Sequence, residues 1–438
     1  MIYWEEEKEE ATKSFSFVAH KLDNVARTLR DEQDKPQRLT EKFLELETAM
    51  QRAIKDFRTP SMYQDALADF GKIMAVVKSL WTHKDFIEFS VSKTSPTASR
   101  QLKAAQQQAN LENIIYGVHS WFLTKRSLFF IYRNLNNSGK GLPHYENFLV
   151  ELNKLSVDIT STDHHLVHTA KKHLTTEISL LTQLITAQIN VQNLQMKESL
   201  VYLYKSKSIL DEWKVALQQE AQGTNQQKQP SRFSYQWLHL FYSAVLSKSS
   251  LYFLEGMGGI GRFPLTATDS SGEASNPEPR QLVSQLPKSD FNFVQQVDTF
   301  SSRTEAFSVS IMIESERLPH HFEGVTYECY PPLYDFEDNK LRGIKSWVAV
   351  FTQPKKAVLG HWPNVINIVF ENRESLDNGE ATQFYDRKVE YTYMVGKVEA
   401  LMYLVAIYKK KEGEGTFREF GSLCHLLRMG KLYDSIKL

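Results

Sequence analysis

The chain has 438 residues, and its 52 lysine and arginine side chains are balanced by 52 aspartates and glutamates. This balance excludes a net field that would attract nucleic acid or an anionic membrane, so we expect no nucleic-acid partner. Hydrophobic residues make up 42% and aromatic residues 12%, which excludes disorder as the main state. The length allows two or three domains.

Cysteine use and apolar runs indicate the compartment. Only Cys329 and Cys424 are present, without the spacing of metal ligands, so we expect no disulfide framework and a cytoplasmic location. The first ten residues are acidic where a secretory signal would be basic and then apolar. No run of 18 apolar residues occurs, so any membrane association is expected to be indirect.

Residues 1–255 are predicted to form an antiparallel helical bundle. Apolar residues recur there at steps of three and four, which is the period of a helix face that needs a partner. The clearest stripes are Leu39, Phe43, Leu46, Met50 and Phe57; Ile114, Val118, Trp121, Phe122, Phe129 and Tyr132; Leu174, Ile178, Leu181, Ile185 and Ile189; and Phe233, Trp237, Leu240, Ala244, Ser247, Leu251 and Leu254.

Four histidines, His164, His165, His168 and His173, crowd one segment of this part. His164 and His168 would lie one turn apart on a helix, as zinc ligands can. A zinc protease needs a glutamate directly after the first histidine, and His165 occupies that place. The segment therefore favours a helix start, and no metal site is predicted.

Residues 256–287 are rich in Gly, Ser, Pro and Thr and are predicted to be a flexible linker between two domains. Residues 256–261 match the G-x-G-x-x-G fingerprint of dinucleotide-binding proteins. That fingerprint binds a cofactor only between a strand and a helix. Here a helical stripe precedes it and a polar loop follows, so no cofactor is predicted.

Residues 288–438 change from helical to mixed periodicity. Alternating strands and helices are typical of an α+β domain, here one sheet covered by helices, with a roadblock- or longin-like topology. The fold class is therefore a multidomain α and α+β protein. Strands are predicted at 307–313, 347–352, 365–370 and 401–408, and helices at 291–304, 381–395 and 417–429.

Two short segments of this part are distinctive. Residues 361–370, HWPNVINIVF, are predicted to be a turn followed by a strand, because a proline precedes an apolar run. Residues 384–393, FYDRKVEYTY, are predicted to be a helix that lies on the sheet. His361 has no serine, cysteine or carboxylate at a catalytic spacing, so no catalytic residue is predicted.

Four residues are predicted to contribute to a protein interface: Trp362, Tyr385, Lys409 and Lys410. Trp362 is interpreted as a core or interface anchor, since tryptophan is common in both places. The basic run 409–411 is either the solvated end of an element or part of a docking patch.

The segments HWPNVI and FYDRKVEYTY, with WLHLF at 237–241 and SLYF at 250–253, resemble the KICSTOR subunit 2 family. The resemblance runs with gaps from about residue 110 to the end. It implies a non-enzymatic scaffold subunit whose partners are the other KICSTOR subunits, including the large scaffold subunit, and GATOR complex 1. It also implies recruitment to the lysosomal membrane surface, where the complex restrains mTOR complex 1 when amino acids or glucose are scarce.

One alternative stays open, an enzyme whose active site lies between the two domains. His361, Asp386 and Glu390 are its candidate groups, because clefts between domains often hold active sites. A deep polar pocket with perturbed ionisable groups would favour the enzyme. A shallow, apolar surface would favour the scaffold.

Overall fold

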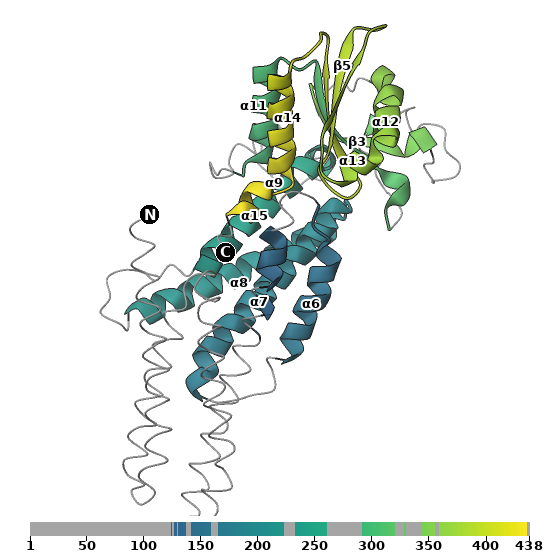
Figure 1. Ribbon diagram of the computed structural model, residues 1–438. Coiled ribbons are helices and arrows are strands. Elements are labelled where there is room, and N and C mark those ends of the chain that lie inside the picture. Colours follow the sequence, from purple (N-terminus) through teal and green to yellow (C-terminus); the bar gives the residue numbers. More distant parts are fainter. Residues whose placement is uncertain are drawn as a thin grey trace, which may run out of the picture.

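The structure is a computed structural model, and long helices and a sheet between helices are its two main parts (Figure 1). The predicted stripe at residues 39–57 lies outside the described residues. The structure describes residues 124, 127–128, 130–136, 142–158, 165–222, 233–260, 291–319, 328–329, 343–354 and 359–435.

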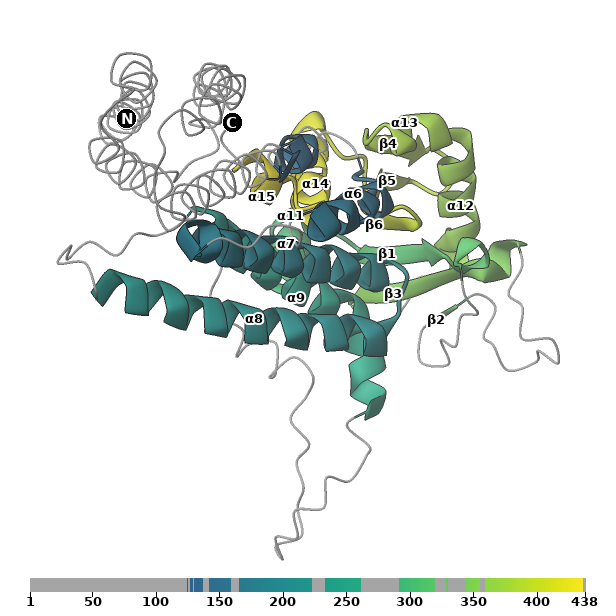
Figure 2. The same cartoon turned by 90° about the horizontal axis from the view of Figure 1, so that it is seen from below.

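The helical part is organised around α7 (His165–Gln192), which packs against its three long neighbours. These are α6 (Tyr145–Asp158), α8 (Met196–Gln222) and α9 (Phe233–Ile260). α8 follows α7 after a three-residue turn, so the two helices run antiparallel, side by side (Figure 2). The predicted stripe from Leu174 to Ile185 is buried, which confirms the helical assignment of this segment.

The sheet has six strands in the order β2-β3-β1-β6-β5-β4, and each neighbouring pair is antiparallel. The strands at its centre are buried on both faces, which explains their nearly continuous apolar sequences. Their bounds are β1 (Ser308–Glu314), β2 (Glu328–Cys329), β3 (Trp347–Gln353), β4 (Thr382–Asp386), β5 (Tyr391–Lys397) and β6 (Met402–Tyr408).

Helices cover both faces of the sheet (Figure 1). α11 (Phe293–Thr304) and α14 (Glu414–Leu427) lie on one face together with the end of α9, and α12 (Trp362–Glu371) and α13 (Arg373–Asp377) lie on the other. Short 3-10 turns at Ser315–Arg317, Gly343–Ser346 and Leu359–His361 complete this part, and α15 (Gly430–Asp434) follows α14.

Alternation along the strands divides the apolar side chains between two cores. Val309 and Ile311 of β1 face α9, α11 and α14, whereas Met312 faces α12. α11 begins at a local cap, because the Asn292 side chain accepts a hydrogen bond from the Gln295 amide at 3.1 Å.

Two of the predicted elements are wrong. Residues 365–370 belong to helix α12, because Pro363 lies in its first turn, where proline is favoured, and Trp362, Val365 and Val369 share one buried face. Residues 381–395 form the β4–β5 hairpin, whose turn contains Glu390 at φ +60°. The strands predicted at 307–313, 347–352 and 401–408 and the helices at 291–304 and 417–429 are confirmed.

α9 continues to Ile260, so the first five residues of the predicted linker are helical here, and residues 261–290 lie outside the described residues. The glycine fingerprint therefore begins inside a helix end and not after a strand. One hydrophobic core runs without a break from the long helices to the sheet face beneath α11 and α14. The division into a domain 1–255 and a domain 288–438 stays a prediction.

Candidate functional site

The four predicted interface residues lie around one end of the sheet, where β4 and β6 finish and β5 and α12 begin. The register places Tyr385 beside Thr392 and Thr392 beside Tyr408, so β4, β5 and β6 each have one terminus at this edge of the fold. Lys409 and Lys410 follow directly on β6. This end of the sheet, defined by Phe307, His361, Tyr385, Tyr391 and Lys409, is named the hairpin end below.

Aromatic rings gather at the hairpin end. The ring centroids of His361 and Tyr391 are 4.4 Å apart, and the Phe307 ring lies 5.8 Å from Tyr391 and 6.2 Å from His361. The Lys409 ammonium lies 4.0 Å from the centre of the Phe307 ring, which is within the range of a cation–π contact. A partly exposed aromatic cluster with a cation on it is suited to contact another surface.

His361 fastens α12 to β5. Its Nδ1 atom lies 2.7 Å from the Tyr393 hydroxyl oxygen, which also accepts a hydrogen bond from the Asn364 amide at 3.2 Å. Because that oxygen accepts from Asn364, its own hydrogen can be donated to Nδ1. Burial lowers the pKa of His361 and raises the pKa of Tyr393. A neutral imidazole held in this way is a structural group.

The other two groups of the enzyme alternative do not join His361. Asp386 accepts a hydrogen bond from the Lys388 amide at 2.8 Å within the hairpin turn, and Glu390 is exposed in the same turn. Within the described residues, the ring nitrogen of His361 is bonded to a tyrosine and not to a carboxylate. The three residues therefore do not form a base with an orienting acid.

The predicted interface residues differ in exposure. Trp362 is only 2% exposed and packs in the core beneath α12, so its ring cannot contact a partner unless that core opens. Tyr385 is partly exposed, and Lys409 and Lys410 are exposed. Lys410 lies 3.4 Å from Glu412 and 3.8 Å from Glu305. Interface roles for the exposed three residues stay a prediction.

Groups that could bind metal or act as nucleophiles are used in packing. The His173 Nδ1 atom accepts a hydrogen bond from the Trp213 indole at 2.9 Å, which joins α7 to α8. The side chains of His164, His165 and His168 lie outside the described residues. In the part that the structure describes, no group of three His, Cys, Asp or Glu side chains could hold a metal ion. Burial raises the pKa of the Cys424 thiol to about 12.

Among the described helices, none combines the length and the apolar character that a bilayer crossing requires.

A buried carboxylate joins the sheet to the long helices. Glu399, in the turn between β5 and β6, is 2% exposed, and its Oε1 atom lies 2.6 Å from the Lys248 ammonium. Tyr252 donates to the same oxygen at 3.2 Å, and the Gln188 amide donates at 3.2 Å. Burial lowers the pKa of Lys248, opposed by Glu399, and raises the pKa of Tyr252. We refer to Gln188, Lys248, Tyr252 and Glu399 as the buried joint.

Sequence reasoning missed the buried joint. Lys248 and Glu399 lie 151 residues apart in the sequence, and no sequence pattern predicts that they pair. The available signal was Lys248 itself, a lysine within the apolar stripe of α9. A lysine is rarely buried unless it is paired, so its position called for a carboxylate elsewhere.

Two more contacts fasten α15 to the long helices. The hydroxyl groups of Tyr145 and Tyr433 lie 2.6 Å apart, and the Trp237 indole donates to the Leu432 carbonyl at 3.2 Å. Burial raises the pKa of Tyr145 and of Tyr433. Helix α15 is therefore anchored on α6 and α9.

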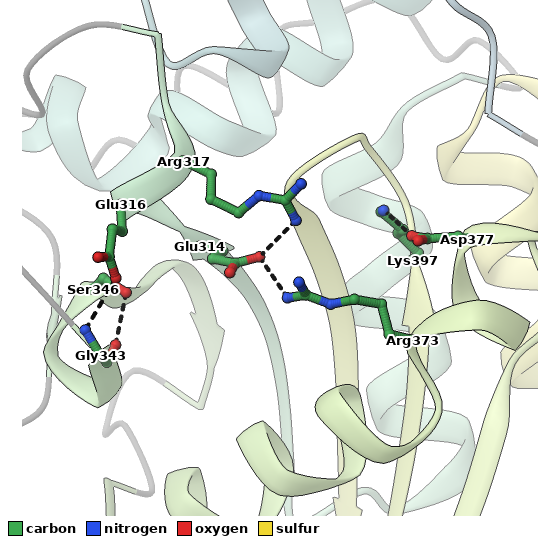
Figure 3. A network of polar contacts seen from close by, with 8 residues as sticks. All are labelled: Glu314, Glu316, Arg317, Gly343, Ser346, Arg373, Asp377 and Lys397. Carbon is green, nitrogen blue, oxygen red and sulfur yellow. Dashed lines mark hydrogen bonds and ion pairs between the residues drawn. The ribbon is translucent and has the colours of Figure 1, made fainter.

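The opposite end of the sheet carries a polar network (Figure 3). The Glu314 carboxylate accepts from Arg373 at 2.9 Å and from Arg317 at 3.4 Å, and Lys397 pairs with Asp377. These contacts fasten α13 to β1 and β5. Because each cation faces a carboxylate of the chain, the network is a set of cross-links and not an open site for an anion.

Comparison with known proteins covers both parts of this architecture. The family profile described as "KICSTOR complex C12orf66 like" matches residues 128–438, which include the long helices and the whole sheet. The chain belongs to this KICSTOR family. The resemblance predicted from the HWPNVI and FYDRKVEYTY segments is thereby confirmed.

Two curated relatives bear the name KICSTOR subunit 2. The protein of Xenopus laevis is 24% identical over 272 residues, which cover 60% of this chain and 56% of the relative. The protein of Danio rerio is 24% identical over 305 residues, which cover 67% of this chain and 63% of the relative. The chain thus spans less than two thirds of the length of either KICSTOR relative.

Proposed function

We propose that this chain is a non-enzymatic scaffold subunit of a KICSTOR complex. The observation that carries the proposal is the family match over residues 128–438, because it includes the helices, the sheet and the buried joint that connects them. Both relatives described above are named as subunits of that complex.

The use of reactive side chains supports a binding role. His361 holds Tyr393, Cys424 is buried with a raised pKa, and Glu399 is paired with Lys248. An enzyme needs such groups directed toward a substrate, with pKa values suited to proton transfer. Here they connect elements of the fold, as expected of a rigid scaffold.

The arrangement of the second part supports the proposed roadblock- or longin-like module. Apart from the two-residue β2, the strands lie in the sheet in the order β3-β1-β6-β5-β4. Along the chain, α12 and α13 come after the β1–β3 pair and before the three strands β4, β5 and β6. We propose that residues 1–255 and 288–438 are the two domains of the chain, with residues 256–287 as the linker between them. Fold alone does not determine function, so the proposed role rests on the family.

Within KICSTOR, we propose that the chain helps tether GATOR complex 1 to the lysosomal surface and so restrains mTOR complex 1 during amino-acid or glucose starvation. Its direct partners would be the other KICSTOR subunits, including the large scaffold subunit. Recruitment from the cytoplasm would occur through these partners, so membrane association would be indirect. Within the hairpin end and directly beside it, the proposed contact surface consists of Tyr385, Lys409 and Lys410.

Cells that lack the protein test this role. During starvation they should keep mTOR complex 1 signalling high, with GATOR complex 1 dispersed from lysosomes. Re-expression of a folded His361→Gln, Asp386→Asn variant should restore both behaviours, because the proposal requires no proton transfer by either group. If that variant enters the complex normally and still fails to restore signalling, the non-enzymatic role is excluded.

A further inference from the structure

Large apolar side chains are exposed on the outer side of α8. Tyr204 is 79% exposed, and Leu200, one turn before it, is 44% exposed. α8 makes its main contacts with α7 and α9 and lies at the outside of the helical part (Figure 2). No described element therefore covers these two side chains. Neighbouring apolar side chains at the surface often mark an interaction site.

The spacing along α8 and α9 joins these side chains to a row of aromatic groups on α9. Positions 200, 204, 207, 211 and 214 of α8 step by four and three, and so do positions 235, 239 and 242 of α9, so each set lies on one side of its helix. Burial lowers the pKa of His239, and the nearby Lys207 and Lys214 lower it further. The two sets are therefore neighbours. The α8–α9 face is defined here by Leu200, Tyr204, Lys214, Tyr235, His239 and Tyr242.

The charge of this face is positive once its internal pair is counted. The Lys207 ammonium lies 2.8 Å from the Asp211 carboxylate, so these two charges compensate each other. Lys214 is exposed, and no carboxylate of the described residues pairs with it. The segment 233–253 of α9 contains neither Asp nor Glu. An occupant of the face is therefore expected to bring a carboxylate to Lys214 and apolar groups to Tyr204.

A second copy of the chain does not meet this requirement. A two-fold axis needs a self-complementary surface. The carboxylate of this surface is Asp211, and Lys207 already holds it. Glu212 lies more than a quarter of a turn further around α8 and accepts a hydrogen bond from Ser208 at 3.1 Å. The charges thus select an occupant of different composition.

We propose that the α8–α9 face binds an amphipathic helix of another KICSTOR subunit, with an apolar stripe over Leu200 and Tyr204 and an acidic residue opposite Lys214. The inference rests on the proposed scaffold role and adds a contact surface separate from the hairpin end. Residues 200–214 extend about 21 Å along α8, which accommodates about four turns of a partner helix. Apolar anchors at steps of three and four are the usual way in which such a helix binds. Tyrosine is also enriched at protein interfaces.

Binding of the purified full-length chain to an immobilised complex of the other KICSTOR subunits tests the proposal. Tyr204→Lys should raise the Kd about tenfold or more, because the partner loses an aromatic anchor. Lys214→Glu should raise the Kd by a similar factor, because the acidic residue of the partner then meets a like charge. Both side chains are exposed, so both variants should keep the unfolding temperature of the wild type.

Two substitutions of the same kind serve as matched controls. Val150→Lys places a lysine at a position that is 55% exposed on α6. Lys205→Glu reverses a charge on the opposite side of α8 from Lys214, where the Lys205 ammonium lies 5.2 Å from the centre of the Tyr202 ring. Both controls should bind with the affinity of the wild type.

Wild-type affinity in Tyr204→Lys and Lys214→Glu, or equal losses in these variants and the controls, would overturn the proposal and leave the scaffold role intact. A wild-type chain that binds none of the subunits would overturn both. A lower unfolding temperature of Tyr204→Lys with an unchanged Kd would assign the face to the apolar stripe at 39–57 of the same chain. Loss of self-association with an unchanged Kd would assign it to a second copy. Either result would also overturn the proposal.

Discussion

At the scale of single residues, the feature with the largest consequence is Glu399. A carboxylate in a strand turn is ordinarily solvated, yet this one is enclosed by Lys248, Tyr252 and Gln188 from two helices. Burying two charges carries a desolvation penalty that only close pairing offsets. Removing one partner therefore leaves the other charge buried and unpaired.

Glu399→Gln should lower the free energy of unfolding by about 3 to 5 kcal/mol, because Lys248 loses its counter-charge in the interior. Urea unfolding measures the change. The matched control is Glu414→Gln, which removes an exposed pair with Arg418 and should change stability by less than about 1 kcal/mol. Equal losses in the two variants would show that the buried joint does not stabilise the fold.

His361 gives a pH-dependent prediction. Burial lowers its pKa in the folded chain, so below about pH 6.5 the unfolded state binds more protons than the folded state. The stability that His361 contributes is thus present above that pH and lost as the pH falls. We expect the urea midpoint to fall less steeply between about pH 7.5 and 5.5 in His361→Gln than in the wild type. Identical pH profiles would contradict this account.

At the scale of elements, close contact between α14 and β5 depends on a glycine. A Cβ atom at Gly396 would lie 2.4 Å from the Cys424 sulfur, which is closer than packed atoms allow. The helix can therefore approach the strand only because this position has no side chain.

Gly396→Ala should destabilise the chain by about 1 to 3 kcal/mol through this clash. Adding Cys424→Ala, which removes the sulfur, should recover part of the loss. Gly421→Ala is the control, because a Cβ there meets open space within α14 and alanine favours a helix. Thermal unfolding distinguishes the three variants. A Gly396→Ala chain as stable as the wild type would refute the close approach.

The sequence predicted elements well where a period repeats over many turns, and poorly where a short segment fits two periods. The α7 stripe continues over several turns and is correct. In α12, the spacing of Ile366 and Ile368 fits a strand, whereas the spacing of Val365 and Val369 fits a helix. A segment of ten residues is too short for periodicity to distinguish the two. The buried joint depends on contacts between distant segments that the helical period does not encode. The enclosure of His361 by the Phe307 ring, which directly precedes β1, and by two rings of β5 was likewise not predictable.

At the scale of the whole molecule, one core and one buried joint extend across the proposed domain boundary. The two parts are then expected to act as one rigid body even if the chain between them is cut. A rigid body suits a scaffold, because it fixes the positions of distant binding surfaces relative to each other.

A protease site placed between α9 and α11 tests this rigidity. After cleavage the two fragments should elute together in gel filtration, because α9 and the β5–β6 turn remain joined through Lys248 and Glu399. In the Glu399→Gln background, the cleaved fragments should separate more readily. Fragments that separate at once in the wild type would contradict the shared core and favour independent domains.

The central claim, membership of a working KICSTOR scaffold, is tested most directly by affinity purification of the tagged chain from cells, followed by mass spectrometry. We expect the other KICSTOR subunits and GATOR complex 1 to be recovered in near-stoichiometric amounts, equally with the wild type and with the His361→Gln, Asp386→Asn variant. Recovery of the folded chain without any KICSTOR subunit would contradict the claim.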